Sequence, residues 1–325
     1  MFMKISVIGV GHLGMIHAKL LKSNHADKLI GIADANAERA AYVAQELGVH
    51  LLDSIDEAIE KSDAVIIAAS TSAHYDIAIK AIASGKHCFI EKPITATHEQ
   101  ALKLIALAEQ HNVIVQVGHV ERFNPALLAL QGYAIDPLFI EAHRLAQFKP
   151  RATDVSVIHD LMIHDIDIIL WMVKSPVKSV EANAVSVLTD TADIANARIT
   201  FENGCVANIT ASRISAQPMR KMRIFQKSGY MSVDFAKPSV DVYRIIDPQA
   251  LQESAIPAMM LGEIESGTQS KAIVFEQPAI PSINAIAEEH QSFIQAIRGE
   301  IPVAVSARDA AEALRIAEMI NASCT

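Results

Sequence analysis

The feature that most constrains the fold is a glycine-rich turn close to the start of the chain. An apolar run of strand length, residues 5–10, leads into Gly9-Val10-Gly11-His12-Leu13-Gly14, and helical spacing begins at His12. Gly9 permits a tight turn, Gly11 lets the backbone approach a pyrophosphate, and Gly14 lets the helix pack closely on the strand. Such a turn predicts a dinucleotide-binding βαβ unit whose helix N-terminus faces the phosphates.

A carboxylate stands where such a unit binds ribose. The second apolar run, residues 29–33, is followed by Asp34, which lies 20 residues after the last glycine of the turn. At that distance a carboxylate can bind the ribose hydroxyls of adenosine. Asp34 would repel a 2′-phosphate, and Ala35 and Asn36 supply no cation, although Arg39 lies one helical turn further on. The pattern therefore favours NAD over NADP.

Strand-length apolar runs alternate with helical segments over the first 120 residues. The further predicted strands are 64–69, 87–90 and 113–117, and the helices after the first are 37–47, 73–84 and 97–111. The strands are apolar throughout, as expected when helices cover both faces of a parallel sheet. Residues 1–120 are therefore predicted to form an α/β dinucleotide-binding domain with a doubly wound parallel sheet.

The pattern changes after residue 120. Asn124-Pro125 begins a short helix, and a second helix is predicted over 160–173. Strand-like runs then follow without helices between them, at 177–188, 195–201, 205–211, 222–226, 230–234 and 240–246. Consecutive strands predict a mostly antiparallel open sheet, so residues 121–325 are expected to form an α+β domain for substrate binding and oligomerisation.

Two later segments complete the second half of the chain. The polar segment 247–271 is predicted to be a loop, and helices are predicted over 284–298 and 306–320. These C-terminal helices can pack back on the first domain. Because the strand-rich domain has no helices in its own sequence to cover both sheet faces, one face is expected to pair with a second subunit in a homodimer or homotetramer.

The composition excludes several classes of protein. The mean hydropathy of +0.24 raises the question of a membrane span, but no stretch reaches the roughly 20 uninterrupted apolar residues that a span requires. The net charge of −9 argues against a nucleic-acid polymer as partner. Three widely spaced cysteines and an N-terminus without a leader pattern predict a cytoplasmic protein without disulfides.

A lysine is predicted to face the cofactor. Glu91-Lys92-Pro93 follows the strand 87–90, and ligands of open α/β sheets bind outside the carboxyl ends of the strands. An ammonium there can hold a substrate oxygen and balance its changing charge. The alternative is a solvated loop lysine.

A histidine with nearby carboxylates is the second candidate for catalysis. At about 100° per residue, Asp160, His164 and Asp167 share one face of the predicted helix. A carboxylate can orient the imidazole and stabilise the imidazolium, which suits a general base. The alternative is a helix start with an exposed acidic face. No metal site is predicted, because His159 and His164 point to different sides of the helix.

The motifs together resemble the Gfo/Idh/MocA family over nearly the whole chain. The resemblance rests on the glycine turn, Glu91-Lys92-Pro93, the strand end Val117-Gly118, and Asp160 four residues before His164. It implies an NAD(P)-dependent oxidoreductase that moves a hydride from a sugar or cyclitol carbinol to nicotinamide, with Lys92, Asp160 and His164 as catalytic residues. The implied cofactor contacts are Gly9, Gly11, His12, Leu13, Gly14, Asp34, Ala69, Ser70, His74, Glu91, Lys92 and His119.

Segments 118–125 and 161–165 resemble the branch of the family that oxidises the 3-hydroxyl of a UDP-linked N-acetylhexosamine. Ala69-Ser70 replaces the Thr-Pro of many members, which leaves backbone contacts there, and Val155-Ser156-Val157 and Met162 replace glycines of many members, which also indicates a particular branch. Cations near the predicted helix suit a diphosphate, since arginine binds phosphate in a bidentate manner; solvated loop charges are the alternative. The predicted substrate contacts are Arg122, Asn124, Arg144, Lys149, Arg151 and Asp167.

Three other functions are compatible with parts of the pattern. A free sugar or inositol dehydrogenase would use the same residues without the phosphate contacts. A nucleotide-binding sensor could use the fold without catalysis, although it would not need Lys92 or the Asp160–His164 pair. A metal-dependent hydrolase would depend on the His/Asp cluster.

Overall fold

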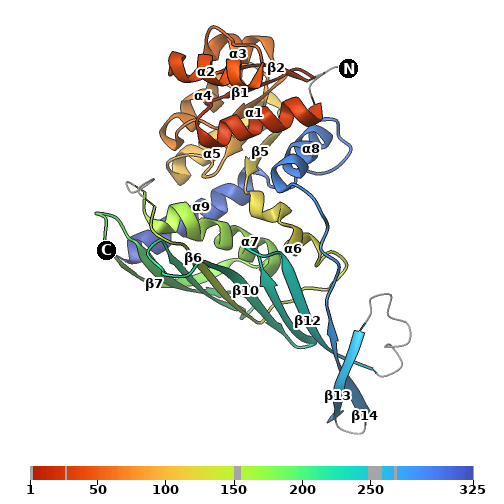
Figure 1. The fold of residues 1–325 in the computed structure, drawn as a ribbon. Helices are drawn as coiled ribbons and strands as arrows, with labels where there is room; N and C mark the ends of the chain where they lie inside the picture. The colour runs from red at the N-terminus through yellow and green to blue at the C-terminus, as the bar shows by residue number, and fades with distance from the viewer. Residues whose placement is uncertain (1–2, 26–27, 150–154, 248–257, 267–268, 325) are drawn as a thin grey trace. The chain divides into compact units, whose positions relative to one another are not determined.

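The computed structural model describes residues 3–25, 28–149, 155–247, 258–266 and 269–324 (Figure 1). The chain divides into two compact units. The first comprises residues 1–120 and 283–315, and the second comprises residues 121–282 and 316–325. The helix α9 (Ala307–Ser323) begins in the first unit and ends in the second.

Five short strands form the sheet of the first unit. They are β1 (Ile5–Ile8), β2 (Leu29–Ala33), β3 (Ala64–Ile67), β4 (His87–Glu91) and β5 (Val115–Gly118). All neighbours are parallel, in the order β2-β1-β3-β4-β5, which puts the switch in strand order between β1 and β3. The predicted doubly wound sheet is confirmed, and ligands of such sheets bind at the carboxyl edge beside the switch.

Helices cover this sheet. They are α1 (His12–His25), α2 (Ala37–Leu47), α3 (Ile55–Lys61), α4 (Thr71–Ala83), α5 (His98–His111) and α8 (Ala285–Ile297). The short helix α3 was not predicted, although Ser54 caps it by accepting the N–H of Glu57. From α8, Phe293 and Ile294 enter the same hydrophobic core as Phe89 of β4. The C-terminal part of the chain therefore contributes to the core of the first unit.

A nine-stranded sheet dominates the second unit. Its strands are β6 (Phe139–Leu145), β7 (Val177–Val185), β8 (Ile194–Phe201), β9 (Val206–Ser212), β10 (Met219–Gln226), β11 (Gly229–Asp234), β12 (Ser239–Ile246), β13 (Ala258–Ser266) and β14 (Gln269–Glu276). The order is β13-β14-β12-β11-β10-β6-β9-β8-β7, and every pair except β6–β9 is antiparallel. The predicted mostly antiparallel open sheet is confirmed.

Two of these strands correct the predicted loop at 247–271. The strand β13 lies inside that segment, and β14 begins within it, while residues 248–257 and 267–268 fall outside the described residues. The two form a hairpin in which β14 also pairs with β12, and Figure 1 shows the hairpin extending beyond the other strands. An edge strand can be exposed because only one side of its backbone is paired, and the strand β13 lies in a segment that is polar elsewhere, so composition alone did not distinguish it from a loop.

The two faces of the large sheet differ. The helix α7 (Ile163–Val173) lies along one face (Figure 1), where Ala142, Ile209 and Met222 are fully buried. On the other face, Phe139, Phe225, Tyr230, Tyr243 and Phe275 lie in register on adjacent strands, with neighbouring ring centroids 4.9–5.8 Å apart. An aromatic ladder thus crosses five strands on the face opposite α7.

The helices of the described residues are too short or too polar to cross a bilayer.

Candidate active site

The glycine turn is crowded at two positions and open at the third. A Cβ on Gly14 would lie 1.8 Å from the carbonyl oxygen of Gly9, and a Cβ on Gly9, whose φ is +83°, would lie 2.4 Å from the backbone nitrogen of Ala69. A Cβ on Gly11 would meet nothing within 4 Å. The start of α1 is exposed at Gly11, His12 and Leu13. The turn therefore has the free space and the helix N-terminus that a pyrophosphate requires.

The carboxylate of Asp34 is held at the end of β2. One of its oxygens accepts the N–H of Val10 at 2.6 Å, and the other accepts the N–H of Asn36 at 2.8 Å. A carboxylate offers about four lone-pair sites, so both oxygens can still accept ribose hydroxyls. Arg39 donates to the carbonyls of Val10 and Gly11 at 2.8 and 3.2 Å. Its guanidinium is thus used to support the turn itself.

The loops after β3 and β4 are joined by a buried histidine. The ring nitrogens of His74 lie 2.9 Å from the carbonyl oxygen of Pro93 and 3.1 Å from that of Ala69. Burial lowers the pKa of His74, so the ring is neutral at pH 7 and donates one hydrogen bond. Ser70 precedes α4 without capping it, and its hydroxyl lies 3.2 Å from that of Ser72.

Lys92 follows β4 at the carboxyl edge of the sheet and is half-buried. The preceding carboxylate, Glu91, is buried and accepts the backbone N–H of Lys92 at 3.1 Å. Its other oxygen lies 2.7 Å from Nε2 of His17. His119, directly after β5, is 1% exposed, and its backbone N–H donates to the carbonyl of Val117. The backbone that carries Lys92 is therefore fixed from inside the unit.

In the second unit, the predicted regular helix over 160–173 is wrong in its first turn. A π-helical turn, Ile158–Met162, precedes α7. Because a π turn has i→i+5 hydrogen bonds, the spacing of about 100° per residue does not hold for Asp160. Asp160 and His164 are half-buried, whereas Asp167 is 1% exposed and binds an arginine.

Two buried arginines hold α7. Arg122 donates from Nε and from its second terminal nitrogen to the two oxygens of Asp167, at 2.6 and 2.8 Å. Arg144, on β6, donates in the same bidentate way to Asp165 at 2.8 and 2.9 Å, and to Glu121 at 2.8 Å. Burial raises the pKa of Asp165 despite Arg144. Burial alone would lower the pKa of Arg144, but the two carboxylates raise it.

This geometry disfavours the prediction that Arg122 and Arg144 bind substrate phosphates. Both guanidiniums are less than 10% exposed, and carboxylates already occupy the forks that a phosphate would need. Asn124 is similarly engaged, since it caps α6 (Pro125–Leu128) and donates to Glu121 and to the carbonyl of Phe235. Lys149 is exposed, and Arg151 lies outside the described residues.

One cation on the α7 face was missed. Arg220 of β10 pairs in register with Arg144, so it points to the same face of the sheet. Its side chain is half-exposed, and it lies 3.5 Å from a carboxylate oxygen of Glu121. Strand alternation within 219–226 would have placed Arg220 on this face once β10 was paired with β6.

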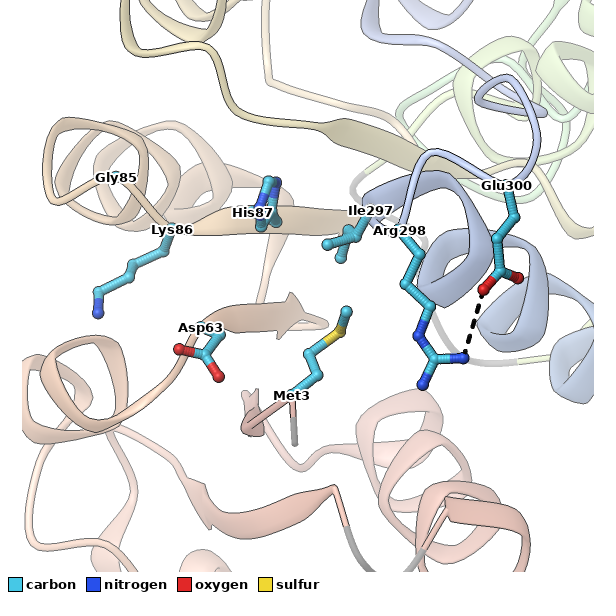
Figure 2. Close-up of a pocket in the computed structure, with 8 residues that line it drawn as sticks. All are labelled: Met3, Asp63, Gly85, Lys86, His87, Ile297, Arg298 and Glu300. Carbon is cyan, nitrogen blue, oxygen red and sulfur yellow. Dashed lines mark ion pairs between the residues drawn. The ribbon is translucent and has the colours of Figure 1, made fainter. Parts of the chain in front are cut away.

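One hollow of the first unit lies away from these residues. This cavity of about 560 Å³ is lined by Met3, Asp63, Gly85, Lys86, His87, Ile297, Arg298 and Glu300 (Figure 2). It opens at the edge where β3 and β4 begin. The ammonium of Lys86 donates to the carbonyls of Glu60 and Ser62, and Arg298 pairs with Glu300. The cavity is therefore at the opposite edge from the glycine turn.

Three or more metal-binding side chains do not cluster anywhere in the described residues.

The fold and these local sites define a class of protein, the NAD-binding oxidoreductases with a second α+β unit. Residues 3–119 match the GFO_IDH_MocA model, an oxidoreductase family with an NAD-binding Rossmann fold, and residues 136–232 match the GFO/IDH/MocA C-terminal domain. The chain belongs to the Gfo/Idh/MocA family of oxidoreductases, which confirms the resemblance.

Two curated relatives and one solved structure show how far the similarity extends. The chain is 39% identical over 303 residues to UDP-N-acetylglucosamine 3-dehydrogenase of Acidithiobacillus ferrooxidans, covering 93% of this chain and 90% of that protein. It is 32% identical over 231 residues to scyllo-inositol 2-dehydrogenase (NAD(+)) of Bacillus subtilis, covering 65% and 68% of the two chains. A crystal structure of the A. ferrooxidans enzyme superimposes with a TM-score of 0.88 at 36% identity, covering 100% and 98%.

The glycine turn generates a paired prediction. Gly11→Ala is expected to leave the melting temperature unchanged and to weaken NAD binding more than about tenfold, because the methyl group enters space reserved for the cofactor. Gly14→Ala is expected to lower the free energy of unfolding by at least about 2 kcal/mol, because its Cβ would overlap backbone. Thermal unfolding and NAD titration check both. Equal stability of the two variants would contradict the assignment.

The buried arginine generates a second prediction. Arg144→Met should cost about 3–5 kcal/mol of unfolding free energy at pH 7, because two carboxylates stay buried without their partner. When folding raises the pKa of a carboxyl, the free energy of unfolding falls as the pH rises from the unfolded-state pKa through the folded-state pKa. Since the pKa of Asp165 rises further without Arg144, the deficit should narrow as the pH falls toward about 5. Denaturant titrations at both pH values measure it.

The matched control is Arg223→Met. Arg223 of β10 pairs with Glu141 of β6 at 3.0 Å, but its side chain is 50% exposed. Its loss should cost less than about 1 kcal/mol at either pH. An equal loss of unfolding free energy in Arg144→Met and Arg223→Met would show that burial does not decide how much an ion pair contributes to stability.

Proposed function

We propose that this protein oxidises the 3-hydroxyl of a UDP-linked N-acetylhexosamine and transfers the hydride to NAD. The observation that carries the proposal is the nearly full-length similarity to the A. ferrooxidans UDP-N-acetylglucosamine 3-dehydrogenase. Inositol dehydrogenases match a smaller part of the chain, and oxidation of a free cyclitol is the second candidate.

The described residues fit the cofactor. Gly11 leaves the space that a pyrophosphate would fill, and the N-terminus of α1 offers unpaired N–H groups. Asp34 would accept the ribose hydroxyls, and the loop with Ala69 and Ser70 lies beside Gly9. When bound, NAD supplies the hydride acceptor.

We assign the acid–base chemistry to three side chains. His164 takes the proton of the substrate hydroxyl as the carbinol carbon loses its hydride and becomes a ketone. Asp160 orients His164 and stabilises its imidazolium. Lys92 holds the reacting oxygen and balances its charge. The support lies in the family motif and in how each unit anchors the adjacent backbone, at Glu91 and at Asp165.

The diphosphate requires cations other than Arg122 and Arg144. Arg220 is half-exposed on the face that α7 covers, and Lys149 is exposed after β6. We assign Arg220 to the phosphates, with Lys149 and Arg151 as further contacts. An arginine suits this task because its fork matches two phosphate oxygens.

Kinetics separate the candidate functions. With NAD and UDP-N-acetylglucosamine, the wild type should form reduced nicotinamide, and Lys92→Ala and His164→Ala should each lower kcat/KM by about 10²–10⁴-fold while NAD affinity stays within about twofold. Arg220→Ala should raise KM for the UDP-sugar. Turnover of myo-inositol alone would favour the second candidate. NAD binding without any turnover would favour a sensor, and near-normal kinetics in both catalytic variants would refute the assigned roles.

We further propose that the protein is a cytoplasmic homo-oligomer whose subunits pair through the face of the nine-stranded sheet opposite α7. The aromatic ladder lies there, and Phe225 within it is 38% exposed. Beside the ladder on the same sheet is a polar hollow of about 490 Å³, lined in part by Glu141, Arg198 and Asn208. Apolar rings next to polar groups are typical of the core and rim of an interface.

The oligomer has its own test. Light scattering at micromolar concentration should give the mass of a dimer or tetramer, and Phe225→Glu with Tyr243→Glu should give a monomer, because two carboxylates would be buried without partners. Lys178→Glu, on the exposed edge strand β7, is the control and should leave the mass unchanged. A monomeric wild type would refute this proposal.

A further inference from the structure

A second buried cluster lies behind the carboxylate of Glu91. His17 of α1, His290 of α8 and Glu91 of β4 come from distant parts of the chain, and the two imidazoles are no more than 1% exposed. Nε2 of His17 lies 2.7 Å from Oε1 of Glu91, and Nδ1 of His17 lies 2.7 Å from Nε2 of His290. At these distances the three side chains form one continuous chain of hydrogen bonds.

The chemistry of the groups sets the direction of the hydrogen bonds. A carboxylate only accepts, so Nε2 of His17 carries the hydrogen shared with Glu91. Burial, with His17 and His25 nearby, lowers the pKa of His290 well below its usual value, so its ring is neutral. Nδ1 of His290 is buried and has no hydrogen-bonding partner among the residues that the structure describes. An orphaned acceptor is less costly than an orphaned N–H, so Nε2 of His290 carries its hydrogen and donates to His17.

The chain of hydrogen bonds ends at the backbone of Lys92. The second oxygen of Glu91 accepts the backbone N–H of Lys92 at 3.1 Å. The same carboxylate packs against Gly118 of β5, where an added Cβ would lie 3.0 Å from both oxygens. Glu91 is therefore held by a histidine and by the Lys92 backbone, and it packs against a neighbouring strand.

We propose that His17 and His290 are positioning residues that act through Glu91 to fix the backbone of Lys92. The inference rests on the proposed function, because it assumes that Lys92 holds the reacting oxygen. His290 donates to His17, His17 donates to Glu91, and Glu91 accepts from Lys92. The helix α8 thereby contributes to the reaction without touching substrate, although it follows the second unit in the sequence.

Packing alone is the rival explanation. Phe89 lies 5.5 Å from the ring of His17 and 6.1 Å from that of His290, and Phe293 lies 5.8 Å from Phe89. If the histidines only fill this core, an apolar side chain of similar size at 290 should serve as well. If they relay hydrogen bonds, a residue that keeps a donor at the same place should be needed.

The experiment compares His290→Leu with His290→Gln. Leucine packs but cannot donate, whereas the glutamine amide can donate to Nδ1 of His17. His290→Leu should lower kcat at least about tenfold with KM for NAD and for the UDP-sugar within about twofold, and His290→Gln should recover kcat to within about threefold of the wild type. Low-field imidazole N–H resonances of the cofactor-free protein supply a second readout. The one assigned to His17 should shift in His290→Leu and be retained in His290→Gln.

Two further variants keep the outcome decisive. Glu91→Gln should lower kcat in the same way, because an amide cannot accept from His17 and Lys92 together, and it replaces His290→Leu if that variant does not fold. His50→Gln, at an exposed histidine, is the control. Wild-type kcat in both His290→Leu and Glu91→Gln overturns the relay while Lys92→Ala stays inactive. Normal turnover of Lys92→Ala would instead overturn the role assigned to Lys92, and absence of turnover of the UDP-sugar by the wild type would overturn the proposed function.

Discussion

Buried carboxylates that neighbour the working side chains in sequence are the constraint on which the candidate site depends. Glu91 precedes Lys92 and binds its N–H, and Asp165 follows His164 and binds Arg144. In both units the side chain proposed to act is half-buried, while the side chain of the residue beside it is buried. A reacting group needs its backbone held within a fraction of an ångström, and a buried, hydrogen-bonded carboxylate restrains the backbone more tightly than apolar contacts, which have no direction.

Holding α7 in this way has an electrostatic consequence. Removing two arginines and three carboxylates from water is costly, and only well-oriented, fully paired partners offset that cost. Arg122 and Arg144 meet the condition with two bidentate pairs and a further bond to Glu121. A guanidinium so engaged and so little exposed has few donors left for a diphosphate. Among the described residues of that face, the half-exposed Arg220 is an arginine that remains accessible to an anionic substrate.

Local patterns predicted much of the fold and less of the site. The glycine turn, Asp34 and the Glu91-Lys92-Pro93 motif work through neighbours in sequence, so spacing alone located them, and the two sheets followed from the order of strands and helices. The strand β6, the short helix α3 and the hairpin of β13 and β14 were missed, because each depends on pairing or capping that composition does not show. The π turn before α7 was missed for the same reason, since no residue pattern in 158–162 marks it.

Partners far apart in sequence explain the errors in the site. Asp167 is 45 residues from Arg122, and His290 is 273 residues from His17, so neither pair can be read from local spacing. Periodicity nevertheless contained part of the answer. His17 lies on the buried stripe of α1 with Gly14, Ala18 and Leu21, and a buried imidazole must find a hydrogen-bonding partner. Arg144 alternates in phase with the buried Ile140 and Ala142. An arginine in phase with a strand's buried face signals a buried carboxylate opposite it, not an anionic ligand.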